Sequence, residues 1–535
     1  MIVAHIETAL GYKNFESIVT TPHLDMVYVG PFDFSIAMGH PGDYEHPDVA
    51  QPMSRILELS RKHRVPFGTT VSNAEIAAQW VRRGCSFFMS SMNSVCCGKE
   101  LPKRSMPIAW SAAEDSQKAF RQYNQKMPML NRSEDYDRFC QQKLADPYPL
   151  FDELREKDPV HWCEPLGSWL STRYADAYVG LNDARLLGGR RSMYAKILNN
   201  ENREKASALV DHVDLWLQNQ KPPSHTRLRK LAGAAFTPRQ IKDLSPRIDR
   251  IVREKLEAVR AKGHCDFVTE FCYWVPATVI CDMLGLPQTD HEYFQRLMAD
   301  LVPFTSAAGP QVNAAVEPGY RAMQEMLAYF SKKIEDRRRS PGSDVLSALV
   351  HAEVDGDCLS EEELFALCIF LFVAGHETTA SLLANGTMLL LTHPDQLAIL
   401  KSRPQELLDT AIEELIRFES PVTRAIRHAV EDVKIGDRSL RAGDTIVFLI
   451  GAVNRDPAQF PAPEKLNIQR APNKHLGFGW GRHFCLGAEL ARLEARIAFP
   501  LIFQLLPNLR LTDELCKWRP IFGIRSLSTL PIRVD

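Results

Sequence analysis

The feature of this sequence that most restricts its fold is a change of periodicity after about residue 98. Residues 1–98 alternate between short apolar segments and helical segments, in the order MIVAHIE, NFESIVTT, LDMVYVG, VAQPMSRILELSRKH, VPFGTTV, AEIAAQWVRRG and CSFFMSS. This alternation predicts a parallel α/β sheet of four strands with helical crossovers. From about Asn131 long helical patterns with few strands replace it. A single fold therefore cannot account for the whole chain.

The stretch between these two regions is polar and breaks the alternation. It contains KELPKRSMP and EDSQKAFRQYNQK, which read as a connecting segment. We therefore predict an α/β domain over residues 1–98, a linker over residues 99–130 and a mainly α-helical domain over residues 131–535. The chain of 535 residues is long enough for several domains.

Three segments of the mainly helical region carry clear helix signals. Ser360 precedes Glu363 by three residues, a capping box that predicts a helix running to about Thr392. A second helix is predicted from Pro404, because apolar residues share one of its faces: Leu407, Leu408, Ala411, Ile412, Leu415 and Ile416. A third helix is predicted from near Cys485, with an apolar stripe of Leu490, Leu493, Ile497 and Leu501.

The charge and apolar content exclude several classes of partner. Lys and Arg number 64 against 66 Asp and Glu, so no basic excess points to nucleic acid or to an anionic membrane. The longest strongly apolar run, residues 364–375, has 12 residues, whereas a membrane-spanning helix needs about 20. No secretory segment begins the chain, so we expect a cytoplasmic protein without a membrane anchor. The 12 cysteines form no CxxC pair, which predicts mostly free buried thiols.

One cysteine lies in a different setting, within Phe478-Gly-Trp-Gly-Arg-His-Phe-Cys-Leu-Gly487. Gly479, Gly481 and Gly487 permit unusual backbone dihedrals and a close approach to a ligand. Cys485 precedes a predicted helix, whose positive end can stabilise a thiolate. A cysteine beside glycines can also be merely a small buried residue, which we expect of most other cysteines. Here the glycines, Phe478, the histidine and the following helix together predict a thiolate ligand for iron.

This segment resembles the haem-binding signature of the cytochrome P450 family. Further segments match that family in the expected order: DPYPLFDELREKDPVHW, STRYADA, PPSHTRLRKLAGAAFTPRQ, AGHETT, EELIR and AVNRDP. The resemblance covers roughly Asp146 to the C-terminus and is greatest to soluble, bacterial-type members. It implies a helical prism with small β-sheets, and haem b bound through the Cys485 thiolate.

The resemblance also assigns residues around the haem. Its two propionates need cationic partners, implied to be His225, Arg229, Arg427 and His483; His225 and Arg229 are four residues apart and so share a helix face. In the segment Ala374–Thr379, Glu377 and Thr378 match the acid–alcohol pair that delivers protons for oxygen activation. A charged residue in so apolar a helix indicates that Glu377 lines a cavity, and a Thr hydroxyl that bonds back to its own helix can widen it locally.

A salt-bridged pair behind the cysteine loop is implied by the motif EELIR. Glu414 and Arg417 are three residues apart and match the family's structural Glu–Arg pair. The family's third, basic partner falls at Lys465, which cannot form the bidentate contact of an arginine. Arg455 or Arg470 could replace it, and the sequence leaves the choice open.

The N-terminal region resembles a different family, the HpcH/HpaI aldolases, through AHIETA and GPFDFSIAMGHPGDYEHP. Glu7 and Asp33 match that family's divalent-metal carboxylates. Only the second half of the β/α barrel is matched, and the strands carrying the catalytic His and Arg are missing. Four strands cannot close an eight-stranded barrel, so we predict an inactive half-barrel, whether a degenerate fusion, a docking element or an incorrectly joined gene model.

The sequence thus favours a monooxygenase that inserts one oxygen atom from O₂ into a mostly apolar organic substrate, with secondary metabolites as one candidate class. No Gly-rich flavin or nicotinamide motif accompanies the haem region, so electrons must come from a separate ferredoxin or flavoprotein reductase. The alternatives are a nitric oxide reductase-like or peroxide-using haem enzyme, an aldolase or lyase acting through the N-terminal region, and a non-catalytic haem-binding module. Variable loops such as residues 302–316 are expected to form the substrate pocket.

Overall fold

Contacts within the computed structural model separate the chain into residues 1–121 and residues 122–535. This division falls in the stretch predicted to be a linker, residues 99–130, which lies outside the described residues. The structure describes residues 3–6, 8–22, 24–40, 46–71, 85, 87–90, 95–96, 145–189, 194, 198, 203–306, 309–354 and 356–535.

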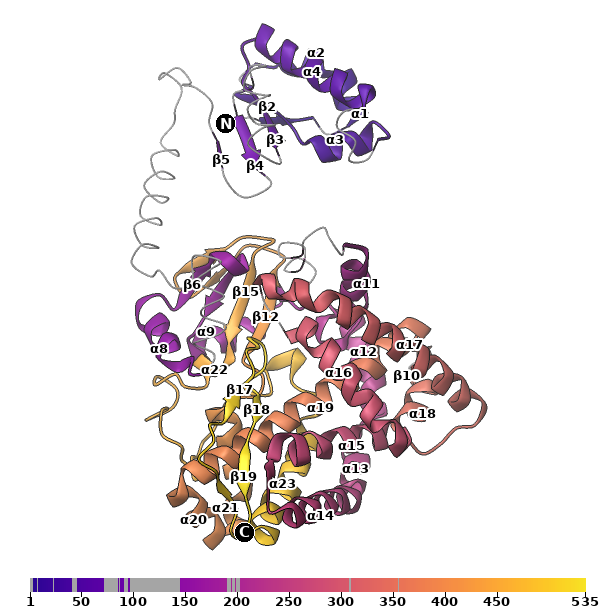
Figure 1. Cartoon of the computed structure of the whole chain (residues 1–535). Coiled ribbons are helices and arrows are strands. Elements are labelled where there is room, and N and C mark those ends of the chain that lie inside the picture. Colours follow the sequence, from indigo (N-terminus) through magenta and orange to yellow (C-terminus); the bar gives the residue numbers. More distant parts are fainter. Residues whose placement is uncertain are drawn as a thin grey trace. The chain divides into compact units, whose positions relative to one another are not determined.

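The N-terminal unit is built on an open sheet (Figure 1). Its strands lie in the order β1 (Val3–His5), β2 (Met26–Val29), β3 (Phe67–Val71), β4 (Phe87–Ser90) and β5 (Val95–Cys96). The first four are parallel, as predicted, whereas the short β5 is antiparallel to β4 and was not predicted. The helices described here are α1 (Ala9–Lys13), α2 (Phe15–Val19), α3 (Pro31–Ala37) and α4 (Pro47–Lys62). The segment AEIAAQWVRRG, predicted to be helical, lies outside the described residues.

Helices α3 and α4 of this unit pack their apolar residues against the sheet. Val27 and Val29 of β2, Phe34 of α3, and Val49 and Ile56 of α4 are fully buried in one core cluster. Of the two predicted metal carboxylates, Glu7 lies outside the described residues. Asp33 belongs to α3, and its side chain is likewise not described.

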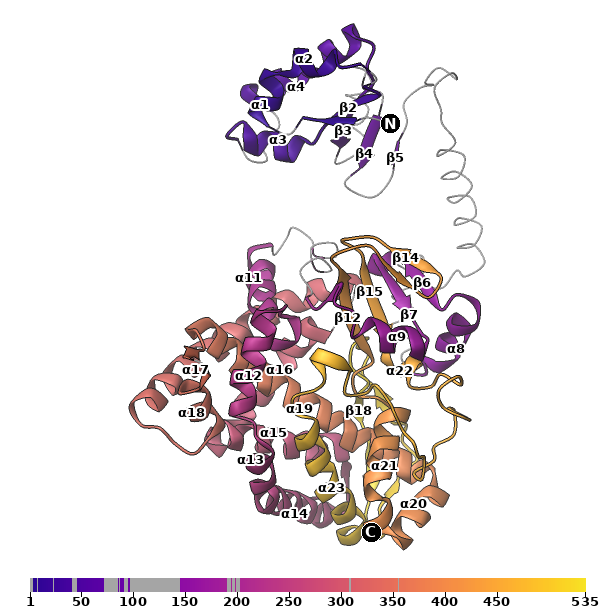
Figure 2. The ribbon, with the colours of Figure 1, turned by 180° about the vertical axis from the view of Figure 1, so that it is seen from behind.

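The C-terminal unit is mainly helical, as predicted, with small sheets (Figure 2). Its helices from the N-terminal side are α8 (Tyr148–Lys157), α9 (Tyr174–Gly180), α11 (Arg203–Asp214), α12 (Ser224–Ala234), α13 (Pro238–Asp243), α14 (Ser245–Lys262), α15 (Trp274–Met283), α16 (His291–Ser306), α17 (Val316–Arg339) and α18 (Val345–Val350). The later ones are α19 (Glu361–Thr392), α20 (Pro394–Ser402), α21 (Pro404–Phe418), α22 (Ile450–Val453) and α23 (Ala488–Leu505).

The largest sheet of this unit has the order β6 (Val160–Cys163), β7 (Ser168–Ser171), β15 (Thr445–Leu449), β12 (Arg424–Ala429) and β8 (Leu186–Leu187). Both ribbon views place β6, β12 and β15 with α8 and α9 on one side of the unit, and α16, α17 and α18 on the other. The smaller sheets comprise β9 (His264–Asp266), β10 (Glu353–Val354), β11 (Asp357–Cys358), β13 (Val433–Ile435), β14 (Arg438–Leu440), β16 (Arg510–Leu511), β17 (Lys517–Trp518), β18 (Leu527–Thr529) and β19 (Pro531–Arg533).

The central helix α19 begins and ends where the sequence predicts. The Ser360 hydroxyl accepts from the Glu363 backbone N–H, and the Glu363 carboxylate accepts from the Ser360 N–H, which completes the capping box. By length and composition α19 is the one helix among the described residues that could cross a membrane, but most of it is buried inside the protein. Gly375 lets α15 approach closely, because a Cβ atom there would lie 2.3 Å from Ile280 Cδ1.

Two features of this unit differ from what the sequence predicted. Helix α20 was not predicted, because its nine residues carry little amphipathic pattern. The stretch expected as a variable loop, residues 302–316, is largely helical: α16 continues to Ser306, and a 3₁₀ helix spans Gly309–Ala315. As predicted, the cysteines in the described part of the chain form no disulfide, and most of them are buried.

Candidate functional site

The loop that carries Cys485 depends on the conformational freedom of two of its glycines. Gly479 and Gly481 have φ of 73° and 68°, the left-handed region that favours glycine. The Cys485 N–H donates to the Phe478 carbonyl at 2.9 Å, which closes the loop. Gly487 instead has an ordinary φ of −90° and caps α23. A Cβ atom at Gly487 would meet nothing within 4 Å, so this glycine borders open space.

That open space belongs to a cavity of about 330 Å³ bordered by Cys485. Thr378 and Gly375 of α19 line it too, as does His225 of α12. Its remaining wall is mostly apolar and includes Trp216, Leu217, Ile280, Phe370, Val373, Leu382, Val422 and Ile524. Thr305 and Ser306 contribute from the segment that was expected to shape the pocket. The structure therefore brings the predicted cysteine and the predicted threonine to one cavity.

The surroundings of Cys485 favour the thiolate less than predicted. Its side chain is reached from the cavity but is otherwise enclosed by protein, and this enclosure raises the pKa of Cys485. The Gly487 backbone N–H and the charges of Arg229 and Arg492 oppose the rise without cancelling it. A metal ion deprotonates a thiol that coordinates it, so bound iron would oppose this effect of burial.

The four predicted cationic partners line one part of the same cavity. His225 and Arg229 come from α12, Arg427 from β12 and His483 from the cysteine loop. The His225 and His483 rings lie 4.3 Å apart between centroids. Burial, together with neighbouring positive charges, lowers the pKa of His225 to about 4 and of His483 to about 2. Burial and Arg482 lower the pKa of Arg427 to about 10.

These groups form a buried basic cluster that lacks an acidic partner in the described part of the chain. His225 Nε2, Arg427 Nε and His483 Nδ1 are buried without a hydrogen-bond partner among the described residues. Buried donors of this kind are normally paired, since leaving them unpaired costs about 1–3 kcal/mol each. A ligand with negatively charged groups would satisfy them. The thiol, the open space beside Gly487 and this basic cluster together fit haem, with its two propionates at the cluster.

Glu377 does not line the cavity, contrary to prediction. Its carboxylate is buried and accepts from the Tyr273 hydroxyl at 2.9 Å and 3.2 Å. It also forms an ion pair with Arg519, whose guanidinium donates to the Tyr273 oxygen at 2.6 Å. These partners explain how an apolar helix tolerates the charge. No sequence signal pointed to them, because Tyr273 and Arg519 are 104 and 142 residues away from Glu377.

Thr378 behaves as predicted in one respect and not in another. Its hydroxyl donates to the Ala374 carbonyl at 2.7 Å, the expected bond back to its own helix. The predicted local widening is not seen, since α19 is assigned as continuous α-helix from Glu361 to Thr392. Because the hydroxyl proton is used by Ala374, the oxygen is left to accept a hydrogen bond inside the cavity.

The Glu414–Arg417 pair is fully buried in a dense polar network. Arg417 donates to both Glu414 oxygens, at 2.7 Å from Nε and 2.9 Å from Nη2. Arg470 supplies the third, basic partner, with its Nε 3.1 Å and 3.2 Å from the two Glu414 oxygens. Arg455 pairs with Glu419 instead. Lys465 is exposed and contributes only its backbone carbonyl, as an acceptor from Arg417 and Arg470.

A second carboxylate of α21 ties this network to the cysteine loop. Glu413 accepts from His475 at 3.0 Å and from Arg492 of α23 at 2.7 Å. Burial alone would raise the pKa of Glu413, but the hydrogen bonds from His475 and Arg492 outweigh it and lower the pKa to about 2. The Arg492 guanidinium also lies over the Phe478 ring, 4.5 Å from its centroid. The segment before Cys485 is thus fixed to the helix after it.

We expect Arg470→Leu to lower the free energy of unfolding by about 3 kcal/mol, since it removes one partner from a buried charge network. Chemical denaturation followed by circular dichroism would measure the change. Lys465→Leu is the matched control and should stay within about 0.5 kcal/mol of the parent, because its side chain is exposed. Equal destabilisation by the two substitutions would contradict the assignment of Arg470.

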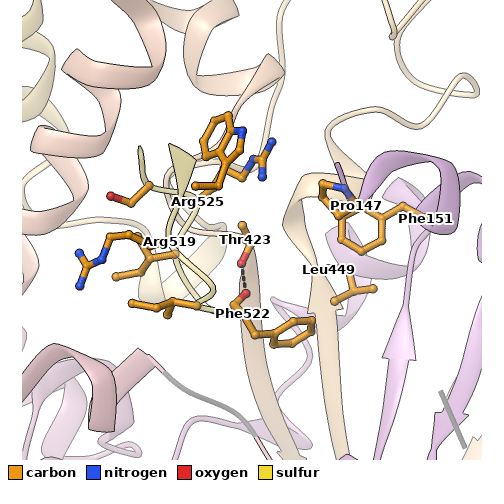
Figure 3. Close-up of a pocket in the computed structure, with 11 residues that line it drawn as sticks. Pro147, Phe151, Thr423, Leu449, Arg519, Phe522 and Arg525 are labelled. Atoms are coloured by element: carbon orange, nitrogen blue, oxygen red, sulfur yellow. Dashed lines mark hydrogen bonds between the residues drawn. The ribbon is translucent and has the colours of Figure 1, made fainter. Parts of the chain in front are cut away.

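The C-terminal strap, residues 521–524, contributes Ile521, Phe522 and Ile524 to the lining of a small hollow of about 20 Å³ (Figure 3). Gly523 and Ile524 of the same strap line the cavity beside Cys485. Gly523 donates to the Ser306 carbonyl at 3.1 Å, and the Thr423 hydroxyl donates to the Phe522 carbonyl at 2.5 Å. The hollow has room for about one water molecule. In Figure 3 the Arg519 guanidinium points away from Thr423 and Phe522, so only the stem of Arg519 borders this hollow. The cavity that Cys485 and Thr378 line is the candidate substrate site, because the predicted iron ligand and the predicted threonine meet there.

Comparison with known proteins agrees with this geometry. The family model "Cytochrome P450" matches residues 168–511, and "HpcH/HpaI aldolase/citrate lyase" matches residues 1–97. The biotin biosynthesis cytochrome P450 of Bacillus subtilis is 37% identical over 394 residues, 73% of this chain and 97% of that protein. The polyketide biosynthesis cytochrome P450 PksS of the same organism is 37% identical over 402 residues. That match covers 73% of this chain and 96% of the length of PksS.

Solved structures show the same relationship. P450BioI in complex with an acyl carrier protein ligated to hexadec-9Z-enoic acid has a TM-score of 0.68 and 34% identity. That match covers 74% of this chain and all of P450BioI, 100%. Both resemblances noted in the sequence are thus confirmed as matches, and the P450 match covers most of the chain. The chain belongs to the cytochrome P450 family.

Proposed function

We propose that this chain, as a haem-thiolate monooxygenase, oxidises an extended apolar substrate of the acyl or polyketide type. The observation that carries this is the apolar wall of the cavity that holds both Cys485 and Thr378. Its matched relatives are named for biotin and polyketide biosynthesis, and the solved P450BioI complex carries a fatty acyl group. A separate ferredoxin with its reductase, or a flavoprotein reductase, would supply the electrons.

The residues around the cavity have distinct parts in this proposal. Haem, when bound, supplies the activation of O₂, with Cys485 as the thiolate ligand. His225, Arg229, Arg427 and His483 would hold the propionates. The apolar wall excludes water and orients the substrate. Thr378 would accept and pass on a proton at its hydroxyl oxygen inside the cavity.

Glu377 would supply that proton from outside the cavity. It precedes Thr378 on α19, but its carboxylate is held by Arg519 and Tyr273. Transfer to Thr378 therefore requires the Arg519 pair to open, or water to join the two groups. Glu377 also favours a monooxygenase over the nitric oxide reductase alternative, since the nitric oxide reductases that resemble this chain lack an acid at this position.

The test is product formation by the haem-loaded protein with a ferredoxin, its reductase and ¹⁸O₂. Hexadec-9-enoic acid, myristic acid and a macrolactone would be screened first for a substrate-induced shift of the haem spectrum. We expect one ¹⁸O atom in the product of a compound that gives the shift. Rapid nitric oxide reduction without any oxygenated product would overturn the proposal.

A further inference from the structure

A further cation lines the cavity besides the four residues assigned to the haem propionates. Arg424 begins β12 and borders the cavity together with Cys485 and Thr378. It is buried, with only 7% of its surface exposed. Building on the proposed function, we propose that Arg424 binds the carboxylate of the substrate. The substrate class would then be free long-chain carboxylic acids, not acyl chains whose carboxyl group is esterified.

Two segments of backbone hold the Arg424 guanidinium in position. Its Nη2 donates to the Ser306 carbonyl at 2.9 Å, at the C-terminal end of α16. The same carbonyl accepts from the Gly523 N–H of the C-terminal strap at 3.1 Å. A Cβ atom at Gly523 would lie 3.0 Å from both Nε and Nη2 of Arg424, so the guanidinium packs directly against the strap. The cation is thus positioned before a substrate enters, which lowers the entropic cost of binding.

Arg424 has the chemistry to hold the Ser306 carbonyl and a substrate carboxylate at the same time. A guanidinium carries five N–H donors in a planar fork, which matches the two oxygens of a carboxylate. Charge-assisted bonds of this kind are about twice as strong as neutral hydrogen bonds, and the low dielectric of a cavity strengthens them further. An ester offers acceptor oxygens without the charge. Arg424 would therefore distinguish an acid from its ester.

The lining around Arg424 suits a molecule with one polar end and an apolar body. Val422 and Ile426, two residues before and after it, line the same cavity, as does Ile524 of the strap. Thr305 of α16 adds a hydroxyl to this lining. A carboxylate bound at Arg424 would leave an alkyl chain to pack against the apolar wall, which burial of its surface favours.

A purely structural role is the competing explanation for Arg424. An arginine at the C-terminal end of a helix can hydrogen-bond the last carbonyls and interact favourably with the helix dipole. Loss of such a contact at α16 would change the cavity wall for every ligand alike. Discrimination between an acid and its neutral ester is therefore the property that only carboxylate binding predicts.

The experiment compares the binding of hexadec-9-enoic acid and of its methyl ester to the haem-loaded full chain, at about pH 7.5, where the acid is ionised. Dissociation constants would come from the shift of the haem spectrum, or from calorimetry where a ligand gives no shift. Arg424→Gln removes the charge and keeps an amide donor, whereas Arg424→Lys keeps the charge without the fork. Arg441→Gln is the matched control, because Arg441 is exposed and does not line the cavity.

We expect the parent and Arg441→Gln to bind the acid at least about tenfold more tightly than the ester. In Arg424→Gln the two dissociation constants should come within about threefold of each other, with ester binding close to that of the parent. Arg424→Lys should retain part of the preference. The proposal is overturned if the parent binds the ester as tightly as the acid, or binds no acid. It is equally overturned if Arg424→Gln weakens acid and ester by the same factor.

These binding constants need no turnover, so they test Arg424 separately from the proposed function. Acid binding that depends on Arg424, without any ¹⁸O-labelled product, would support the role of Arg424 and contradict the monooxygenase. Labelled product from a parent that shows no preference for the acid would support the monooxygenase and overturn only the role of Arg424.

Discussion

Cys485→Ser should abolish the spectral signature of thiolate-bound haem in the reduced, carbon monoxide-bound protein, together with all oxygenated product. A serine hydroxyl is a far weaker donor to iron than a thiolate, whose electron density favours cleavage of the O–O bond. The loss should be complete within detection, because the substitution removes the side chain that would bind the iron. Spectra of the purified variant, with haem quantified separately, would measure it.

Cys358→Ser provides the matched control for this substitution. Cys358 is exposed in β11 and does not line the cavity. It should therefore leave the thiolate signature and the product yield unchanged. If Cys485→Ser kept the parent spectrum, another residue would bind the iron, and the assignment of the cavity would be wrong.

The main features of the haem region were predictable because they depend on local sequence. The capping box at Ser360 fixes the start of α19 without help from the tertiary structure. The glycines of the cysteine loop are required by backbone angles, as the positive φ of Gly479 and Gly481 confirms. The four cationic residues of the cavity, which come from α12, β12 and the cysteine loop, were named through the family resemblance, which the cysteine loop supports.

What the sequence did not predict depends on contacts between distant segments. Arg519 and Tyr273 are indistinguishable from surface residues in the sequence, yet folding places both against Glu377. The choice of Arg470 over Arg455 as the third member of the Glu414 network is likewise decided only by the path of the loop before the cysteine. The burial of Cys485, which raises its pKa against the hydrogen bond from the Gly487 N–H, also depends on the tertiary structure.

Thr378→Ala should uncouple electron consumption from product formation, with hydrogen peroxide released in place of product. Proton delivery by a positioned group typically contributes about 10²–10⁴ in rate, so the loss should be large. Haem content and the substrate-induced spectral shift should remain normal. Thr392→Ala is the control on the same helix, since Thr392 makes a matching bond to the Met388 carbonyl at 2.9 Å. Unchanged coupling in Thr378→Ala would remove Thr378 from the relay.

Glu377→Gln and Arg519→Gln together decide whether Glu377 carries protons or only anchors Arg519. Both substitutions break the same ion pair, so a purely structural role predicts the same loss of stability and activity in the two variants. In a relay, only Glu377→Gln removes the proton-carrying group, and oxygen activation should slow by up to about 10²–10⁴. Arg519→Gln keeps the carboxylate, with Tyr273 still beside it, and frees it to turn toward Thr378. We therefore expect Arg519→Gln to retain turnover while Glu377→Gln loses it.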